Sequence, residues 1–200
     1  MSWTPLFRGV DYEKRAELLL AFLKQKPAEN DGVYSAYMNI LHYIAGSLAV
    51  RSEYRYVSEE AQKWLTEHGK KADYDAFYAE HWSQEGLTTE HTIPVNVIKN
   101  YLLGLTGAEL TVGHLAEVIG KTSGLALITK DEDKKLTKAG RHSNLCDIHD
   151  KKFKGDNKDD AIAAENRKIL EEIIAGKTPH GIRYEKAGIA MAETNHDAKA

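Results

Sequence analysis

The sequence predicts an α+β protein: a mostly helical N-terminal half and a C-terminal half built around a short two-stranded β-hairpin and a metal-binding helix. Helical spacing of apolar residues dominates the first part of the chain. After Gly86 the pattern changes to a β-favouring run at Leu87–Ile93, and a second apolar run at Leu125–Ile128 leads into a helix. We therefore expect a helical subdomain at 1–86 and a second region at 87–200, with ββα-metal-like organisation and a C-terminal helix.

Composition narrows the class of protein. The 200 residues are 42% hydrophobic and 28% charged, which is ordinary for a soluble domain with a real core. A net charge of −3 means that any nucleic-acid site has to be a local basic patch. The single cysteine, Cys146, excludes an internal disulfide framework and a four-cysteine zinc site. With no signal-like start and no long apolar run, we expect a cytoplasmic protein with no membrane partner.

Helix-start residues mark the N-terminal elements. Asp11 is expected to cap a first helix that ends before Pro27, and Ser58 to cap a helix with acidic residues in its first turn. Apolar residues at helical spacing predict further helices at Val33–Ala49 and Asp73–Trp82.

The C-terminal half reads as strand, two helices, strand and helix. Thr129 and Glu132 form a Thr-x-x-Glu capping box that opens a helix at Lys130–Lys138, closed by Gly140. The other helices expected here are Val95–Leu105, Thr111–Gly120, and one that starts at Asp159 or Asp160 and ends at Gly176.

One stretch of the sequence suggests chemistry. Hydrolysis of a phosphodiester needs an activated water and positive charge near the leaving oxygen, which one divalent metal and a neutral histidine can supply. His91 stands at the end of the first expected strand, and the second strand leads into a helix that begins with Asp131, Glu132 and Asp133. These oxygen ligands suit Mg2+ or Mn2+ as a cofactor better than zinc.

The run Glu90-His91-Thr92-Ile93-Pro94 resembles the opening motif of HNH (ββα-metal) endonucleases. The resemblance covers roughly residues 88–149 and leaves the helical N-terminal half unexplained. It implies that His91 is the general base and that Glu90 is a metal ligand. The sequence departs from the family in a long helical insertion between the strands and in the absence of the structural zinc cysteines.

The rest of the motif can be placed in two ways. In the first, the segment from Asn144 to His149 is the family's tail, so that Asn144 orients the base and His149 binds metal. In the second, the helix after Leu125–Ile128 is the metal helix and Asp133 is the last ligand. Either placement requires His91 to converge with its partners around one metal ion.

The resemblance implies DNA as the substrate. A homodimer would suit the cutting of both strands of a duplex. The candidates for phosphate contact are the lysines around the two placements: Lys134, Lys135, Lys151, Lys152 and Lys154.

Each feature also has a structural interpretation, and two other classes of function stay open. Pro94 suits the first turn of a helix for backbone reasons, and the acidic residues after Lys130 complement a helix dipole. Leu110–Ile128 partly resembles a helix-turn-helix regulator, although the second helix is missing. A helical immunity- or antitoxin-like interaction module would account for the acidic balance and would need no metal.

Overall fold

The computed structural model describes residues 11–48, 54–153 and 157–193, and within these ranges the protein is α+β. The helices are α1 (Tyr12–Leu23), α2 (Tyr34–Leu48), α3 (Glu59–Glu67), α4 (Tyr74–Ala79), α5 (Val95–Leu103), α6 (Val112–Thr122), α7 (Lys130–Lys138), α8 (Lys158–Ile174) and α9 (Ile182–Lys186). The strands are β1 (Tyr56–Ser58), β2 (Leu87–His91), β3 (Leu125–Thr129) and β4 (Met191–Glu193), with short 3-10 helices at Trp82–Glu85 and Gly107–Glu109.

Side-chain caps start several of these helices where the sequence predicts. Asp11 and Ser58 each accept a hydrogen bond from the backbone N–H three residues later, which confirms both as N-caps. α4 is shorter than predicted, because the chain turns at His81, whose φ is +56°, and continues as a 3-10 helix. α8 starts earlier than predicted, with Asn157 as its N-cap residue. The predicted end of α2 at Ala49 lies outside the described residues.

The two predicted strands pair with each other inside a larger sheet. β2 and β3 are antiparallel, from the pair Leu87–Thr129 to the pair His91–Leu125. Among the described residues, the sheet has four strands in the order β2-β3-β1-β4, whereas the sequence predicted a hairpin of two. β1 lies parallel to β3, and β4 is antiparallel to β1.

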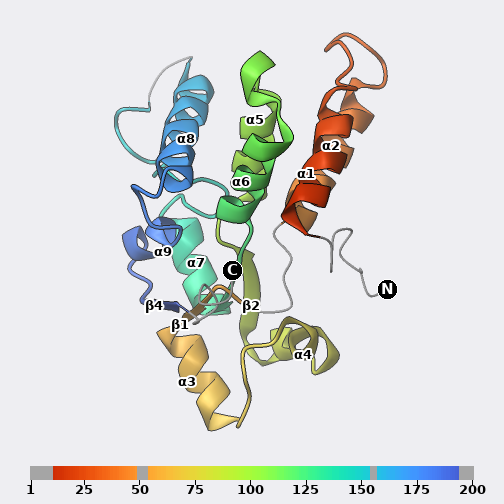
Figure 1. Cartoon of the computed structure of the whole chain (residues 1–200). Helices are drawn as coiled ribbons and strands as arrows, with labels where there is room; N and C mark the ends of the chain where they lie inside the picture. The colour runs from red at the N-terminus through yellow and green to blue at the C-terminus, as the bar shows by residue number, and fades with distance from the viewer. Residues whose placement is uncertain (1–10, 49–53, 154–156, 194–200) are drawn as a thin grey trace.

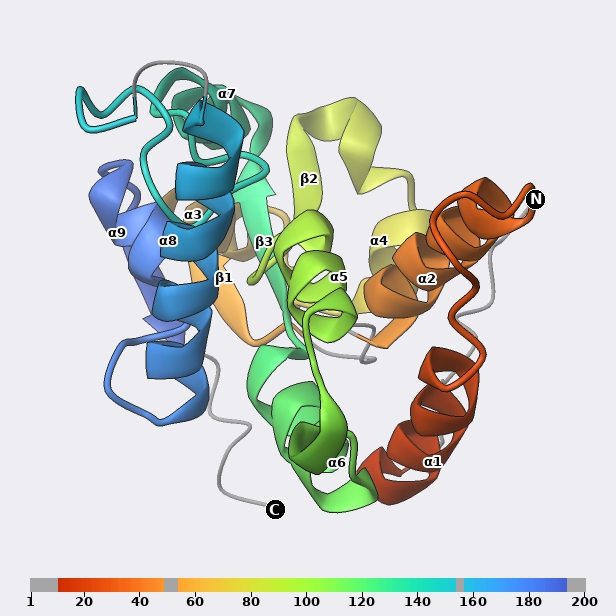
Figure 2. The same ribbon diagram turned by 90° about the horizontal axis from the view of Figure 1, so that it is seen from above.

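Helices cover both faces of the sheet and one end of it (Figure 1). α3 and α4 pack on one face, over a cluster that includes Leu87 and Leu127. α7 and α9 lie on the opposite face, whose apolar residues include Ala126 and Leu136. The largest cluster joins α1, α2, α5, α6 and α8 beyond the end of the sheet, and Figure 2 shows these helices side by side. The sheet thus has two separately covered faces.

The sheet crosses the predicted domain boundary at residue 86. β1 belongs to the first predicted region, yet it pairs with β3 and β4 of the second. α6 ends at Thr122 and β3 begins at Leu125, so the second helix of a helix-turn-helix does not follow α6. Among the described residues, we find no helix with both the length and the apolar character that a bilayer crossing requires.

A buried carboxylate connects α7 to the sheet. Glu132 is 4% exposed, and its Oε2 accepts hydrogen bonds from Ser58 Oγ at 2.6 Å and from the backbone N–H of Thr129 at 2.9 Å. The second of these bonds and the return bond from Glu132 N–H to Thr129 Oγ1 form the predicted capping box. Since Ser58 also caps α3, Glu132 links the starts of two helices on opposite faces of the sheet.

We expect Glu132→Ala to lower the free energy of unfolding by about 2–4 kcal/mol, because it leaves a buried hydroxyl and a backbone N–H without their charged acceptor. Urea unfolding followed by circular dichroism measures the change. Glu67→Ala, at an exposed position on α3, is the control and should change stability by less than about 0.5 kcal/mol. Equal effects of the two substitutions would contradict this role for Glu132.

Candidate metal site

Strand alternation separates Glu90 from His91. Successive residues of a strand point to opposite faces of the sheet, and the partners of these two in β3 are Ala126 and Leu125. Ala126 belongs to the cluster under α7 and α9, whereas Leu125 belongs to the cluster under α3 and α4. Glu90 therefore faces α7 and α9, and His91 faces the other way.

Glu90 meets Asp133 and His142 on its face of the sheet. His142 Nε2 lies 3.8 Å from Glu90 Oε1 and 3.6 Å from Asp133 Oδ1. One ligand atom from each of the three residues lies within 4.8 Å of the others. Ligand atoms around a small divalent ion are about 3–4 Å apart, so small side-chain rotations would complete the first half of a coordination shell.

The three side chains differ in their access to solvent. The Glu90 side chain is 17% exposed, that of Asp133 31% and that of His142 49%. The Oδ1 atom of Asp133 is nevertheless buried and accepts no hydrogen bond. A buried carboxylate oxygen without a donor is costly, and a cation or a protonated His142 would satisfy it. The exposed imidazole leaves a route by which an ion can enter.

Arg183 anchors this site by hydrogen bonds from its guanidinium. Its guanidinium is fully buried, and its NH2 group donates to Glu90 Oε2 at 2.9 Å and to the carbonyl of His91 at 2.6 Å. Its NH1 group donates to the carbonyls of Arg141 and His142 at 3.1 and 2.8 Å. One side chain of α9 therefore fixes the end of β2 and the loop after α7.

His91 lies away from the cluster and contacts α2. Its Nε2 is 3.1 Å from the carbonyl oxygen of Gly46, and burial lowers the pKa of the imidazole below its usual 6.5. Arg183 and His42 lower that pKa further, while the Gly46 carbonyl and Glu90 act in the opposite direction. This neutral histidine ties α2 to the sheet, and the structure does not bring it to the two carboxylates.

The other residues suggested by the resemblance also lie outside the cluster. Asn144 Oδ1 accepts a hydrogen bond from the buried Asn166, whose own Oδ1 accepts from the N–H groups of Leu145 and Cys146. His149 packs against Gly140, where an added Cβ would lie 2.8 Å from its ring. Both residues shape the loop between α7 and α8. Of the two placements, only the one through Asp133 reaches Glu90.

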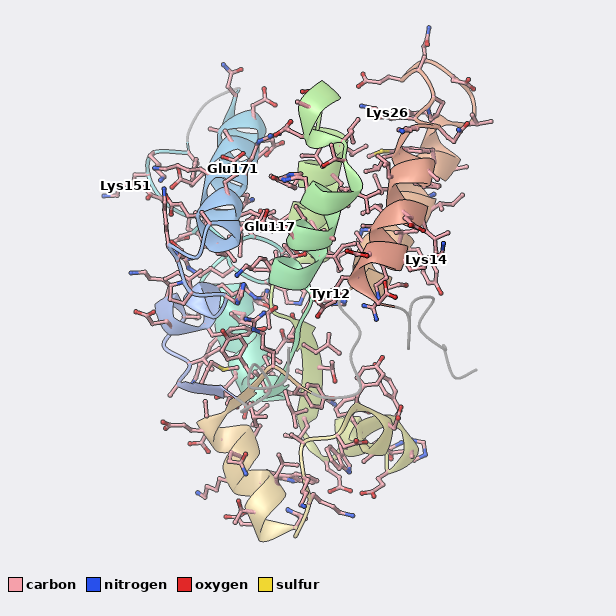
Figure 3. All side chains as sticks on the ribbon, viewed as in Figure 1. Tyr12, Lys14, Lys26, Glu117, Lys151 and Glu171 are labelled. Atoms are coloured by element: carbon pink, nitrogen blue, oxygen red, sulfur yellow. The ribbon has the colours of Figure 1, made fainter. Side chains whose placement is uncertain are left out.

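The predicted phosphate contacts lie along α7 and the loop after it. Lys134 pairs with Asp131 at 2.7 Å, and Lys152 pairs with Glu165 at 3.0 Å. Lys135 and Lys151 are exposed, and Lys151 stands at the outer edge of the molecule in Figure 3. Lys154 lies outside the described residues. The lysines on α7 share their helix with Asp133.

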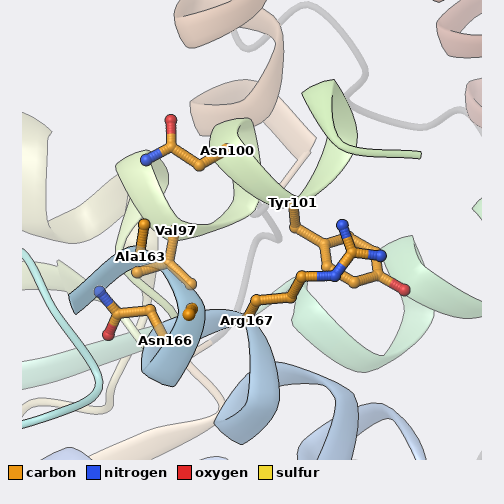
Figure 4. A pocket seen from close by; sticks show the side chains of 7 residues that line it. Val97, Asn100, Tyr101, Ala163, Asn166 and Arg167 are labelled. Atoms are coloured by element: carbon orange, nitrogen blue, oxygen red, sulfur yellow. The ribbon is translucent and has the colours of Figure 1, made fainter. Parts of the chain in front are cut away.

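A cleft lies between α5 and α8 (Figure 4). Its volume is about 200 Å³. Arg167 on its wall pairs with Glu171 and Glu109 and stacks on Tyr101. Another polar group of the wall, Asn166, holds the loop after α7. Both groups are thus occupied by the scaffold.

Comparisons with known proteins add no relative. No protein-family model, curated protein or solved structure matches the chain. The resemblance to HNH endonucleases remains a prediction from short motifs.

Two residues at the site were not among the predicted site residues. His142 stands in a polar, turn-rich segment with no periodicity, so no local pattern marks it as a ligand. Arg183 precedes Tyr184 in a short helix of mixed apolar and charged residues, and only the fold brings it to Glu90. The acidic start of α7 and the strand before it were the signals that located the site.

We expect the free energy of unfolding to fall as the pH drops below about 6.5, because the unfolded chain then binds a proton that folded His91 resists. The stabilisation is complete above that pH, where both states are neutral. Urea unfolding at intervals between pH 5.5 and 7.5 measures this slope. His91→Gln should make this slope shallower, and a slope unchanged in that variant would contradict the role of His91.

Proposed function

We propose that this protein is a divalent-metal-dependent endonuclease that hydrolyses DNA phosphodiester bonds with Glu90, Asp133 and His142 as metal ligands. The observation that carries the proposal is the convergence of these three side chains, with a buried carboxylate oxygen that accepts no hydrogen bond. The order of strand, strand and helix, with Asp133 on the helix, is the part of the HNH resemblance that this site keeps, whereas His91, the general base that the resemblance implies, faces away from it.

The ligand set favours a particular kind of cation. Two carboxylates and one imidazole nitrogen suit Mn2+ better than Mg2+, which prefers oxygen ligands and water. When bound, such an ion supplies an activated water and stabilises charge on the phosphate. With Arg183 counted, the two carboxylates leave one net negative charge at the site, which attracts a cation.

The task of the protein's own side chains is to hold the ion. Glu90 and Asp133 would each supply a carboxylate oxygen to the ion, and the exposed imidazole of His142 would supply a nitrogen. His91 has no part in this scheme, because it faces α2. Hydrolysis would form a bond between water oxygen and phosphorus and break the bond to the leaving oxygen; the attacking water would release its proton to solvent, and the leaving oxygen would take up a proton from solvent.

Positive charge for the DNA backbone comes from the lysines near the site. Lys135 and Lys151 have no carboxylate within ion-pair distance among the described residues. Each can contact a phosphate without first breaking an internal pair. Such contacts set affinity and not sequence preference.

We expect Glu90→Gln, Asp133→Asn and His142→Ala each to weaken Mn2+ binding by more than the roughly 10–100-fold that loss of an outer-shell partner costs. Titration calorimetry measures this affinity. The matched control is Asp131→Asn in the same turn of α7, because Asp131 is exposed and forms its ion pair with Lys134. Wild-type Mn2+ affinity in all three ligand variants would exclude this site.

The activity test uses the same variants. Supercoiled plasmid and single-stranded DNA are incubated with Mn2+, with Mg2+ or with EDTA. Nicking that needs the metal, persists in Asp131→Asn and His91→Gln, and is lost in Asp133→Asn would support the proposal. Metal binding without cleavage of either DNA would rule out the nuclease and leave a metal-binding protein of another class.

We expect Lys135→Ala combined with Lys151→Ala to weaken DNA binding for all sequences alike. The slope of log affinity against log salt concentration should become shallower by about one unit for each phosphate that a lysine no longer neutralises. Fluorescence anisotropy with EDTA present measures binding without cleavage. Lys63→Ala, at an exposed position of α3 on the opposite face of the sheet from α7, should change neither value. An unchanged salt slope in the double variant would place the DNA elsewhere.

A further inference from the structure

Arg183 is a charged side chain in an unusual place. It belongs to the short helix α9 and is 0% exposed, although burial of an unpaired guanidinium is very costly. Five hydrogen bonds offset part of that cost: two from NH1, and three from NH2 to Glu90, the His91 carbonyl and the hydroxyl of Tyr184. The Nε atom is buried and has no hydrogen-bond partner among the described residues. All of these acceptors except Tyr184 belong to the ligand-bearing segments.

The contacts of Arg183 define the shape of the site. Its NH2 group holds Oε2 of Glu90, which leaves Oε1 as the atom nearest to His142. Its NH1 group holds the backbone of Arg141 and His142, so the imidazole is anchored at the base of its own side chain. Glu90 and His142 are far apart in sequence, and one guanidinium sets the distance between their segments.

The positive charge of Arg183 matters for the site as well as the planar geometry of its guanidinium. The carboxylates of Glu90 and Asp133 lie within a few ångströms of each other. Without a nearby positive charge, their mutual repulsion would push the two side chains apart. A positive charge behind Glu90 offsets one of them without occupying the space in front. Tyr184 supports the guanidinium, since its hydroxyl accepts from NH2 and lies 3.4 Å from the His91 carbonyl.

We infer that Arg183 is a positioning residue of the metal site: it turns Glu90 and anchors His142, and thereby sets the affinity and the coordination geometry for a divalent cation. This inference rests on the metal site of the proposed function and extends it to a residue that touches neither ion nor substrate. A purely structural arginine would stabilise the fold and leave the bound ion unchanged.

The test compares Arg183→Lys with wild type. Lysine keeps the charge but has no planar fork, so it cannot hold Glu90 and two carbonyls at once. We expect Mn2+ affinity, measured by calorimetry, to fall about 10–100-fold, as for other residues that orient metal ligands. We also expect a change in the visible absorption spectrum of the protein loaded with Co2+, which reports the coordination geometry.

Arg167→Lys is the matched control. Arg167 also pairs with carboxylates and donates to a backbone carbonyl, that of Gly104, but it lies in the cleft between α5 and α8. It should lose some stability and keep both the Mn2+ affinity and the Co2+ spectrum of wild type. Unfolding free energies without metal separate the loss of stability from the loss of binding in both variants.

Tyr184→Phe covers the case in which Arg183→Lys does not fold. It removes one support of the guanidinium and keeps the ring, and we expect it to shift both readouts in the same direction by a smaller amount. A wild-type affinity and spectrum in Arg183→Lys, or in Tyr184→Phe when the lysine variant is unfolded, would overturn the inference.

The failure of this inference differs from failure of the proposed function. If wild-type protein binds no Mn2+ or Co2+, both fall together. If it binds metal and cuts DNA but Arg183→Lys behaves as wild type, only the role of Arg183 is overturned. If Arg183→Lys weakens binding while no variant cleaves DNA, the positioning role stands and the nuclease proposal falls.

Discussion

The antiparallel pairing of β2 with β3 is the constraint on which the rest of the site depends. Its register decides that Glu90 shares a face with Ala126, and that His91 shares the other face with Leu125. A shift by one residue would exchange the two. With this register, the carboxylate faces α7 and α9 and the imidazole faces α2. The register of the β2–β3 pairing thus separates Glu90, the proposed metal ligand, from His91, which packs against α2.

Two buried charges then fix the helices on that face. Glu132 binds the start of α7 to β3 and to the cap of α3, and Arg183 binds α9 to the end of β2 and to the loop after α7. Both charged groups have several hydrogen-bonding partners, as buried charges require. Asp133 follows Glu132 directly in the sequence. The capping residue therefore positions the helix that carries Asp133, the proposed metal ligand.

Local features of this protein could be predicted, and long-range ones could not. Caps and capping boxes such as that of Thr129 and Glu132 are short-range hydrogen bonds, so letters three residues apart reveal them. Strands β1 and β4 have three residues each, too few to show a period. The motif with His91 lies on β2, the strand that also carries Glu90. The His91 side chain, however, is on the opposite face of the sheet from Asp133. His142 and Arg183 acquire their meaning only through the tertiary fold, which no local pattern encodes.

The contact between Arg183 and Glu90 has a consequence for how the protein is made. The two residues are 93 positions apart, and β4, close to the end of the described chain, completes the sheet beside β1. Contacts of such long sequence separation form late, because the entropy of closing the loop must be overcome first. A chain still emerging from the ribosome can form α1 to α8 without α9. Glu90 and His142 then lack their common anchor, so the cluster that they form with Asp133 is held in place only after α9 has been synthesised.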